Sequence, residues 1–223
     1  MKARLAARAF SAFVIGLIVV GLLIFLPAGT FAYPWGWLFC GVLFIPMMIM
    51  GTVLLLKNPA LLEKRLSRKE AQSEQKTVVK LSALMFLLGF VLCGLDFRFG
   101  WFPLPKWIPV AAAVIFLLGY LMYAEVLREN AYLSRTVEVQ EEQQVIDTGL
   151  YGIIRHPMYT ATILMFCTIP LVLGSLIALP VFLLYPVILV RRIRNEEQML
   201  CAGLRGYRDY QKKVKYRLFP HLW

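Results

Sequence analysis

Long apolar stretches separated by short polar segments run through the whole chain. A bilayer core about 30 Å thick requires roughly 20 apolar residues for one helical span. Four stretches reach about that length with few charged residues inside them: residues 9–27, 35–56, 79–96 and 107–127. The pattern therefore predicts four membrane-spanning helices before residue 128.

A fifth apolar stretch, residues 158–190, is too long for one span. Gly174 and Ser175 interrupt it and predict a turn between two short helices, at about 158–173 and 176–193. Three prolines are expected to kink these helices: Pro170, Pro180 and Pro186. Such prolines are tolerated in a membrane span when neighbouring helices satisfy the carbonyl groups that they free. The expected fold class is all-α, a polytopic membrane protein of about six transmembrane helices whose last two form a tight hairpin.

The composition agrees with a membrane protein. Hydrophobic residues make up 60% of the 223 residues and charged residues only 17%, whereas soluble domains carry about 25% charged residues. The four cysteines lack the spacing of a metal site or a disulfide framework: Cys40, Cys93, Cys167 and Cys201. We therefore expect an integral membrane protein without a bound metal.

The net charge of +11 is concentrated beside the apolar stretches, which favours a membrane surface over nucleic acid as the partner of the basic residues. If six spans place both termini on one side, only Arg98 and Lys106 of the 24 Lys and Arg residues fall on the other. By the positive-inside rule, both termini and a C-terminal helix then face the cytoplasm. Glu125, near the end of the fourth span, needs a partner, and Arg128 can supply it.

A cluster of charged and aromatic residues, Arg155 to Tyr159, stands at the mouth of the fifth apolar stretch. Titratable groups at a membrane boundary suggest a functional site, and an interfacial anchor is the alternative interpretation. A helix that begins at Pro157 offers free backbone N–H groups for an anion. His156 and Arg155 would reinforce that site, and Tyr151 or Tyr159 could stack on a planar ligand.

A second cluster lies at the end of the last span. Arg192 and Glu196 are four residues apart, so they share one face of a helix. Glu196 and Glu197 could accept ligand hydroxyl groups, with Arg192 facing an anionic group; a basic cap with solvated acids is the alternative. The six-span topology would bring both clusters to one side. The tyrosines that follow are expected to pack at the interface or to cover a cofactor: Tyr207, Tyr210 and Tyr216.

Together these residues resemble the isoprenylcysteine carboxyl methyltransferase family, whose wider group includes phospholipid N-methyltransferases. The likeness covers about residues 128–220 and rests on three motifs: Gln143…Val145-Ile146-x-x-Gly149-x-Tyr151-x-x-x-Arg155-His156-Pro157-x-Tyr159, then Arg192…Glu196-Glu197, then Gly206-Tyr207-x-x-Tyr210…Tyr216-Arg217-Leu218-Phe219-Pro220. The resemblance implies a membrane enzyme that transfers a methyl group from S-adenosyl-L-methionine to a lipid or to a lipidated small molecule or protein.

The resemblance also implies roles for single residues. Residues 143–146 would line the adenosyl part of the cofactor, whereas Tyr151 and residues 156–159 would hold its methionine part. The catalytic parts would fall to Arg192, which faces the methyl acceptor, and to Glu196 and His156. The full set of implied cofactor-binding residues is Gln143, Gln144, Val145, Ile146, Gly149, Tyr151, Arg155, His156, Pro157, Met158, Tyr159, Glu196 and Glu197.

We expect one membrane domain, with residues 1–127 serving substrate access and residues 128–223 serving cofactor binding and catalysis. Asn130 and Ser134 are candidate substrate contacts. A carboxylate acceptor needs no base, whereas an amine or thiol acceptor would need a glutamate or His156. The alternatives are phospholipid N-methylation, a reductase like the membrane sterol reductases that uses NADPH, and a membrane scaffold or transporter without enzymatic activity.

Overall fold

The computed structural model describes residues 2–66, 73–133 and 143–223. Four of its helices are long and apolar enough to cross a membrane, as the hydropathy pattern predicts. They are α1 (Lys2–Ala28), α2 (Pro34–Lys57), α4 (Ser73–Phe99) and α5 (Trp107–Glu129). The protein is therefore a helical integral membrane protein.

The polar connections hold three short helices. The segment between α2 and α4 contains α3 (Pro59–Leu66), which packs through its buried residues Leu61 and Leu62. A 3₁₀ helix, η1 (Gly149–Gly152), precedes the last apolar helices, and α9 (Tyr207–Lys213) follows them.

The last apolar stretch reverses direction at Gly174. Helix α6 (Pro157–Val172) ends there, and Gly174 adopts a left-handed conformation with φ of 72°. The chain returns through α7 (Leu179–Phe182) and α8 (Leu184–Gly203). Three hydrogen bonds between the two segments show that they run antiparallel, because their residues pair in reverse order along the chain: Cys167 with Phe182, Thr162 with Tyr185, and Tyr159 with Arg192.

The expected single helix over residues 176–193 is in fact two helices. The helix is interrupted at Leu183, which lies between α7 and α8. Helix α8 then continues to Gly203, ten residues beyond the expected end. Pro180 and Pro186 both fall in the first turn of a helix, where a missing N–H group costs nothing. These prolines therefore mark new helix starts rather than kinks in one long helix.

Close helix packing brings the bundle together. Gly119 of α5 lies against α6, where an added Cβ would come within 2.9 Å of Met165 Cγ. Gly94 of α4 lies against α1, where an added Cβ would come within 2.6 Å of the Ile24 carbonyl oxygen. Small residues of this kind allow two backbones to approach closely in membrane proteins.

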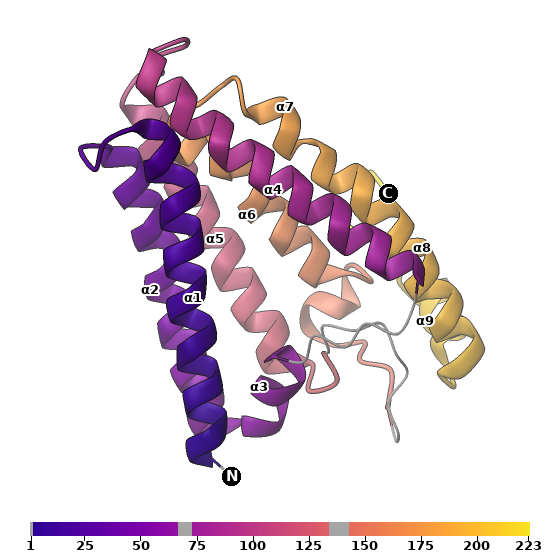
Figure 1. Ribbon diagram of the computed structural model, residues 1–223. Coiled ribbons are helices and arrows are strands. Elements are labelled where there is room, and N and C mark those ends of the chain that lie inside the picture. Colours follow the sequence, from indigo (N-terminus) through magenta and orange to yellow (C-terminus); the bar gives the residue numbers. More distant parts are fainter. Residues whose placement is uncertain (1, 67–72, 134–142) are drawn as a thin grey trace.

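The bundle has two distinct ends (Figure 1). The α1–α2, α4–α5 and α6–α7 connections lie at one end, where Ser175 bridges to Pro103 and Gly174 packs on Trp35. The start of α1, helix α3, the η1 region and α9 lie toward the other end. The two clusters of polar residues singled out in the sequence belong to this second end.

Candidate active site

The site forms where the start of α6 meets the C-terminal segment of the chain. Pro157 occupies the first turn of α6, and His156 is its N-terminal cap residue. The backbone N–H groups of Arg155 and His156 donate to the carbonyl oxygens of Tyr216 and Arg217, each at 2.9 Å. These bonds hold the C-terminal segment against the helix start.

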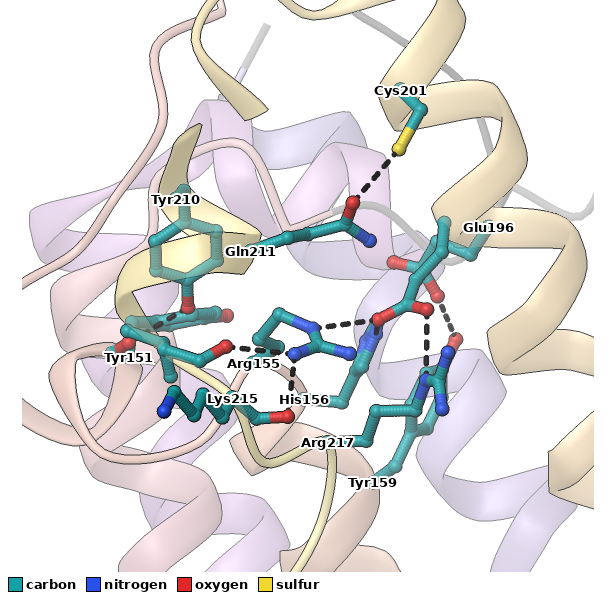
Figure 2. A network of polar contacts seen from close by, with 12 residues as sticks. Tyr151, Arg155, His156, Tyr159, Glu196, Cys201, Tyr210, Gln211, Lys215 and Arg217 are labelled. Carbon is teal, nitrogen blue, oxygen red and sulfur yellow. Dashed lines mark hydrogen bonds and ion pairs between the residues drawn. The ribbon is translucent and has the colours of Figure 1, made fainter. Parts of the chain in front are cut away.

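Glu197 of α8 joins Arg155, His156 and Arg217, which Figure 2 labels, in one polar network. Its carboxylate accepts hydrogen bonds from Arg155 Nε at 2.7 Å, from Arg217 Nε at 2.8 Å and from His156 Nε2 at 3.3 Å, and the residue is only 5% exposed. Burial alone would raise the pKa of this carboxyl group, but the bonds from His156, Arg155 and Arg217 together lower its pKa to about 2. Glu197 is therefore ionised throughout the neutral range.

Arg155 extends this network to the backbone. Its Nη1 donates to the carbonyl oxygens of Val214 at 2.7 Å and Lys215 at 2.8 Å, while its Nε faces Glu197. The planar guanidinium group suits such simultaneous bonding. Arg155, which is 8% exposed, thus fastens α8 and the C-terminal segment to the loop before α6 (Figure 2).

A second polar chain joins α6 to the opposite side of α8. Arg192 Nε donates to the hydroxyl oxygen of Tyr159 at 2.9 Å, and that hydroxyl donates to Glu196 Oε2 at 2.6 Å. The ring of Tyr159 stacks on His156 with centroids 5.6 Å apart. Arg192 and Glu196 do share a helix face, and Tyr159 bridges them.

A cavity lies beside this chain. Most residues that the sequence resemblance assigns to a cofactor line it: Gln143, Gln144, Val145, Ile146, Tyr151, Arg155, His156, Met158, Tyr159, Arg192 and Glu196. Asn130 also lines it and donates from Nδ2 to the Tyr151 hydroxyl at 2.9 Å, whereas Ser134 lies outside the described residues. Residues as far apart in sequence as Asn130 and Tyr210 therefore meet around one cavity.

Three assigned residues do not line the cavity: Gly149, Pro157 and Glu197. Gly149 has a φ of 47° and packs directly on the carboxylate of Glu129, which accepts from Thr148 Oγ1 at 2.9 Å and from the Leu150 N–H at 3.3 Å. Pro157 sets the start of α6, and Glu197 binds Arg155, Arg217 and His156. These contacts give the three residues a structural role beside the cavity. Direct contact with a ligand stays a prediction for each of them.

Sequence reasoning left two tyrosines of α9 out of the assigned set. Tyr207 and Tyr210 both line the cavity, and the Tyr210 hydroxyl donates to the Tyr151 carbonyl oxygen at 2.7 Å. The Tyr207 hydroxyl is buried and has no hydrogen-bond partner among the described residues. Because buried polar groups are nearly always bonded, this hydroxyl fits a site that takes a polar ligand. The Tyr-x-x-Tyr spacing was the available signal.

Comparisons with known proteins show which fold and which family this chain is similar to. A solved eukaryotic intramembrane Ras methyltransferase, ICMT (isoprenylcysteine carboxyl methyltransferase), matches with a TM-score of 0.55 at 18% sequence identity. The match covers 88% of this chain and 72% of that one, so the two share a helical membrane fold. Residues 110–202 match the model of the isoprenylcysteine carboxyl methyltransferase family. The match confirms the resemblance to that family over this region of the chain.

One curated relative comes from a different enzyme class. A Delta(14)-sterol reductase of Mus musculus is 27% identical over 137 residues, which are 54% of this chain and 33% of the relative. The chain therefore spans about a third of the length of that relative.

Proposed function

We propose that this protein is an integral membrane methyltransferase that transfers a methyl group from S-adenosyl-L-methionine to a lipid-borne acceptor, most like isoprenylcysteine carboxyl O-methylation. One observation carries the proposal. Eleven of the residues that the family resemblance assigns to the site line a single cavity, and the cavity's α6 and α8 residues belong to the segment that matches the family model.

The chemistry of the lining fits this cofactor. Residues 143–146 would hold the adenosyl part, and the Glu196 carboxylate can accept hydrogen bonds from ribose hydroxyl groups. The α6 start with His156 suits the carboxylate of the methionine part. The rings of Tyr151 and Tyr159 suit a sulfonium cation. When bound, the cofactor supplies the methyl group.

The protein's own part is positioning and exclusion of water. Methyl transfer requires an in-line arrangement of donor and acceptor, and well-oriented partners can be worth up to ~7–11 kcal/mol of the barrier. Arg192, held by Tyr159, can orient an anionic acceptor beside the cavity. A carboxylate acceptor is already ionised and needs no base, whereas for an amine or thiol Glu196 or His156 would take the proton.

The first half of the chain would serve substrate access. Arg65 of α3 hydrogen-bonds to the Tyr123 hydroxyl of α5, and its Nη1 lies 3.8 Å from the sulfur of Met158, which lines the cavity. This contact supports a role for residues 1–127 on the acceptor side, with residues 128–223 as the cofactor-binding and catalytic half.

The proposed topology has six spans, with α6 and α7–α8 as the last two. The start of α1, α3 and α9 lie toward the same end (Figure 1), which supports placing the N-terminus, α9 and the cavity on one side. The excess of Lys and Arg in the segments at that end supports the cytoplasm as that side. The acceptor would then enter from the bilayer and the cofactor from the cytosol.

A binding experiment tests the proposal. Purified protein in detergent should bind S-adenosylhomocysteine, and Glu196→Gln should weaken that binding at least tenfold, because it removes the carboxylate from the cavity lining. Glu63→Gln is the matched control, since Glu63 is an exposed acid of α3 that pairs with Arg8. Absence of binding by the unaltered protein would refute the cofactor assignment.

Two rival activities remain distinguishable. Phospholipid N-methylation would label lipid amines rather than carboxyl groups when membranes are incubated with methyl-labelled cofactor and the lipid, protein and volatile products are separated. A reductase is favoured by the relative of the sterol reductase class. It predicts that NADPH, and not S-adenosylhomocysteine, raises the melting temperature.

A further inference from the structure

Helix α8 has a second functional face besides the one that carries Arg192 and Glu196. Residues spaced three to four apart on its other side line a groove between α8 and α4, with a volume of about 650 Å³. The groove is lined by Thr77, Val78, Leu81, Val187, Ile188, Arg191, Arg194, Asn195 and Gln198. None of these residues lines the cavity of the candidate active site.

The groove changes from apolar to polar along its length. On α8 the apolar pair Val187 and Ile188 precedes the polar residues that begin at Arg191. On α4 the order is reversed, with Thr77 one turn before Leu81. Since Arg191 and Thr77 belong to the polar end of each helix, the two walls suit a molecule with a polar head and an apolar tail.

The polar end of the groove is positively charged. Arg191 and Arg194 are exposed, and no acidic partner is recorded for either among the described residues. The nearby Arg155 and Arg217, by contrast, are bound to Glu197. Two guanidinium groups three residues apart on one helix face match the oxygens of a phosphate group.

We propose that this groove binds an anionic phospholipid of the leaflet at this end of the bundle. Its phosphate lies at Arg191 and Arg194, and an acyl chain lies along Val78, Leu81 and Val187. The bound lipid packs α8 against α4 and so supports the helix that presents Arg192 and Glu196. The proposal stands apart from the methyltransferase assignment, because it uses a different face of α8, whose groove residues do not line the cavity.

Thermal unfolding in mixed micelles tests the proposal. Phosphatidylglycerol should raise the melting temperature of the protein above its value in phosphatidylcholine, by a shift of about 2–4 °C. The double variant Arg191→Gln, Arg194→Gln should lose this difference. The matched control Arg205→Gln, Arg208→Gln, which removes two exposed arginines outside the groove, should keep it.

A third variant separates a groove from plain surface charge. Val187→Trp keeps both arginines but fills the apolar part, and Val187 is 66% exposed, so the change is compatible with folding. Loss of the phosphatidylglycerol shift in this variant supports the groove. The proposal is overturned if the shift survives in Val187→Trp, if the Arg205, Arg208 control loses it equally, or if inorganic phosphate alone reproduces it.

Discussion

Two buried carboxylates, Glu197 and Asp96, lie at opposite ends of the same bundle and are satisfied in different ways. Glu197 is bound by two arginines and a histidine from the loop before α6 and the C-terminal segment. Asp96, which is 3% exposed, accepts from two neutral donors among the described residues: the Ser175 hydroxyl at 2.5 Å and the Phe102 N–H at 3.1 Å.

The difference indicates what each end must do. Neutral donors are sufficient to fasten the α6–α7 turn to α4, since that end joins connections between neighbouring helices. At the site end, ion pairs between Glu197 and two arginines hold three chain segments around a cavity. The two carboxylates should therefore respond differently to substitution.

Replacing Glu197 should have the largest effect. Glu197→Gln removes the charge that compensates the buried Arg155, and breaking one partner of a buried ion pair costs about 3–5 kcal/mol. We expect that loss in the free energy of unfolding in detergent. Glu63→Gln, at an exposed pair with a 3.7 Å separation, should cost less than about 1 kcal/mol. Equal stabilities for the two variants would contradict the central role of Glu197.

Acid should reveal the same carboxylate without mutation. The folded pKa of Glu197, about 2, lies below its unfolded value of about 4.3, so the folded state binds fewer protons. The corresponding stabilisation, about 3 kcal/mol, is complete above the unfolded pKa and is lost as the pH falls from about 4.3 toward 2. Unfolding measured across that range should show the loss in the unaltered protein and not in Glu197→Gln.

Substitutions at the other end should be milder. Asp96→Asn keeps an oxygen acceptor for the Phe102 N–H but weakens the bond from the Ser175 hydroxyl, and a typical hydrogen bond is worth about 0.5–1.5 kcal/mol. Ser175→Ala leaves one Asp96 oxygen without its donor and should cost about 1–3 kcal/mol. Both variants should bind S-adenosylhomocysteine as the unaltered protein does. A loss as large as that of Glu197→Gln would remove the contrast between the two ends.

The smallest effects should separate the two tyrosines of α9. Tyr210→Phe removes the bond to the Tyr151 carbonyl and should lower stability by about 1 kcal/mol. Tyr207→Phe removes a hydroxyl without a recorded partner, so it should leave the ligand-free protein as stable as before while weakening S-adenosylhomocysteine binding about threefold to tenfold. Matching losses of stability would show that the Tyr207 hydroxyl is bonded in the folded protein.

Local properties of the sequence were sufficient for much of the fold. The four long spans follow from the length of apolar stretches, and the helix start at Pro157 follows from proline chemistry. The expected pairing of Glu125 with Arg128 is confirmed, with a bond of 2.9 Å from Arg128 Nε. In each case the deciding residues are close together in the chain.

The remaining features depend on residues far apart in sequence. The partners of Glu197 are 42, 41 and 20 residues away, so no local pattern could assign Glu197 to the network rather than to the cavity. The break at Leu183 depends on which turn each proline occupies, and hydropathy cannot distinguish a kink from a new helix start.

Residues 214–218 hold the C-terminal segment against the site, because their carbonyl oxygens accept hydrogen bonds from Arg155, His156 and Thr160. During synthesis, α1 to α5 can leave the ribosome and pack while this segment has yet to be made, since domains fold from the N-terminus onward. The cavity is therefore expected to assemble only at the end of synthesis, after the long helices have formed. A chain that ends before residue 214 would therefore insert its helices but would be unable to hold its ligand.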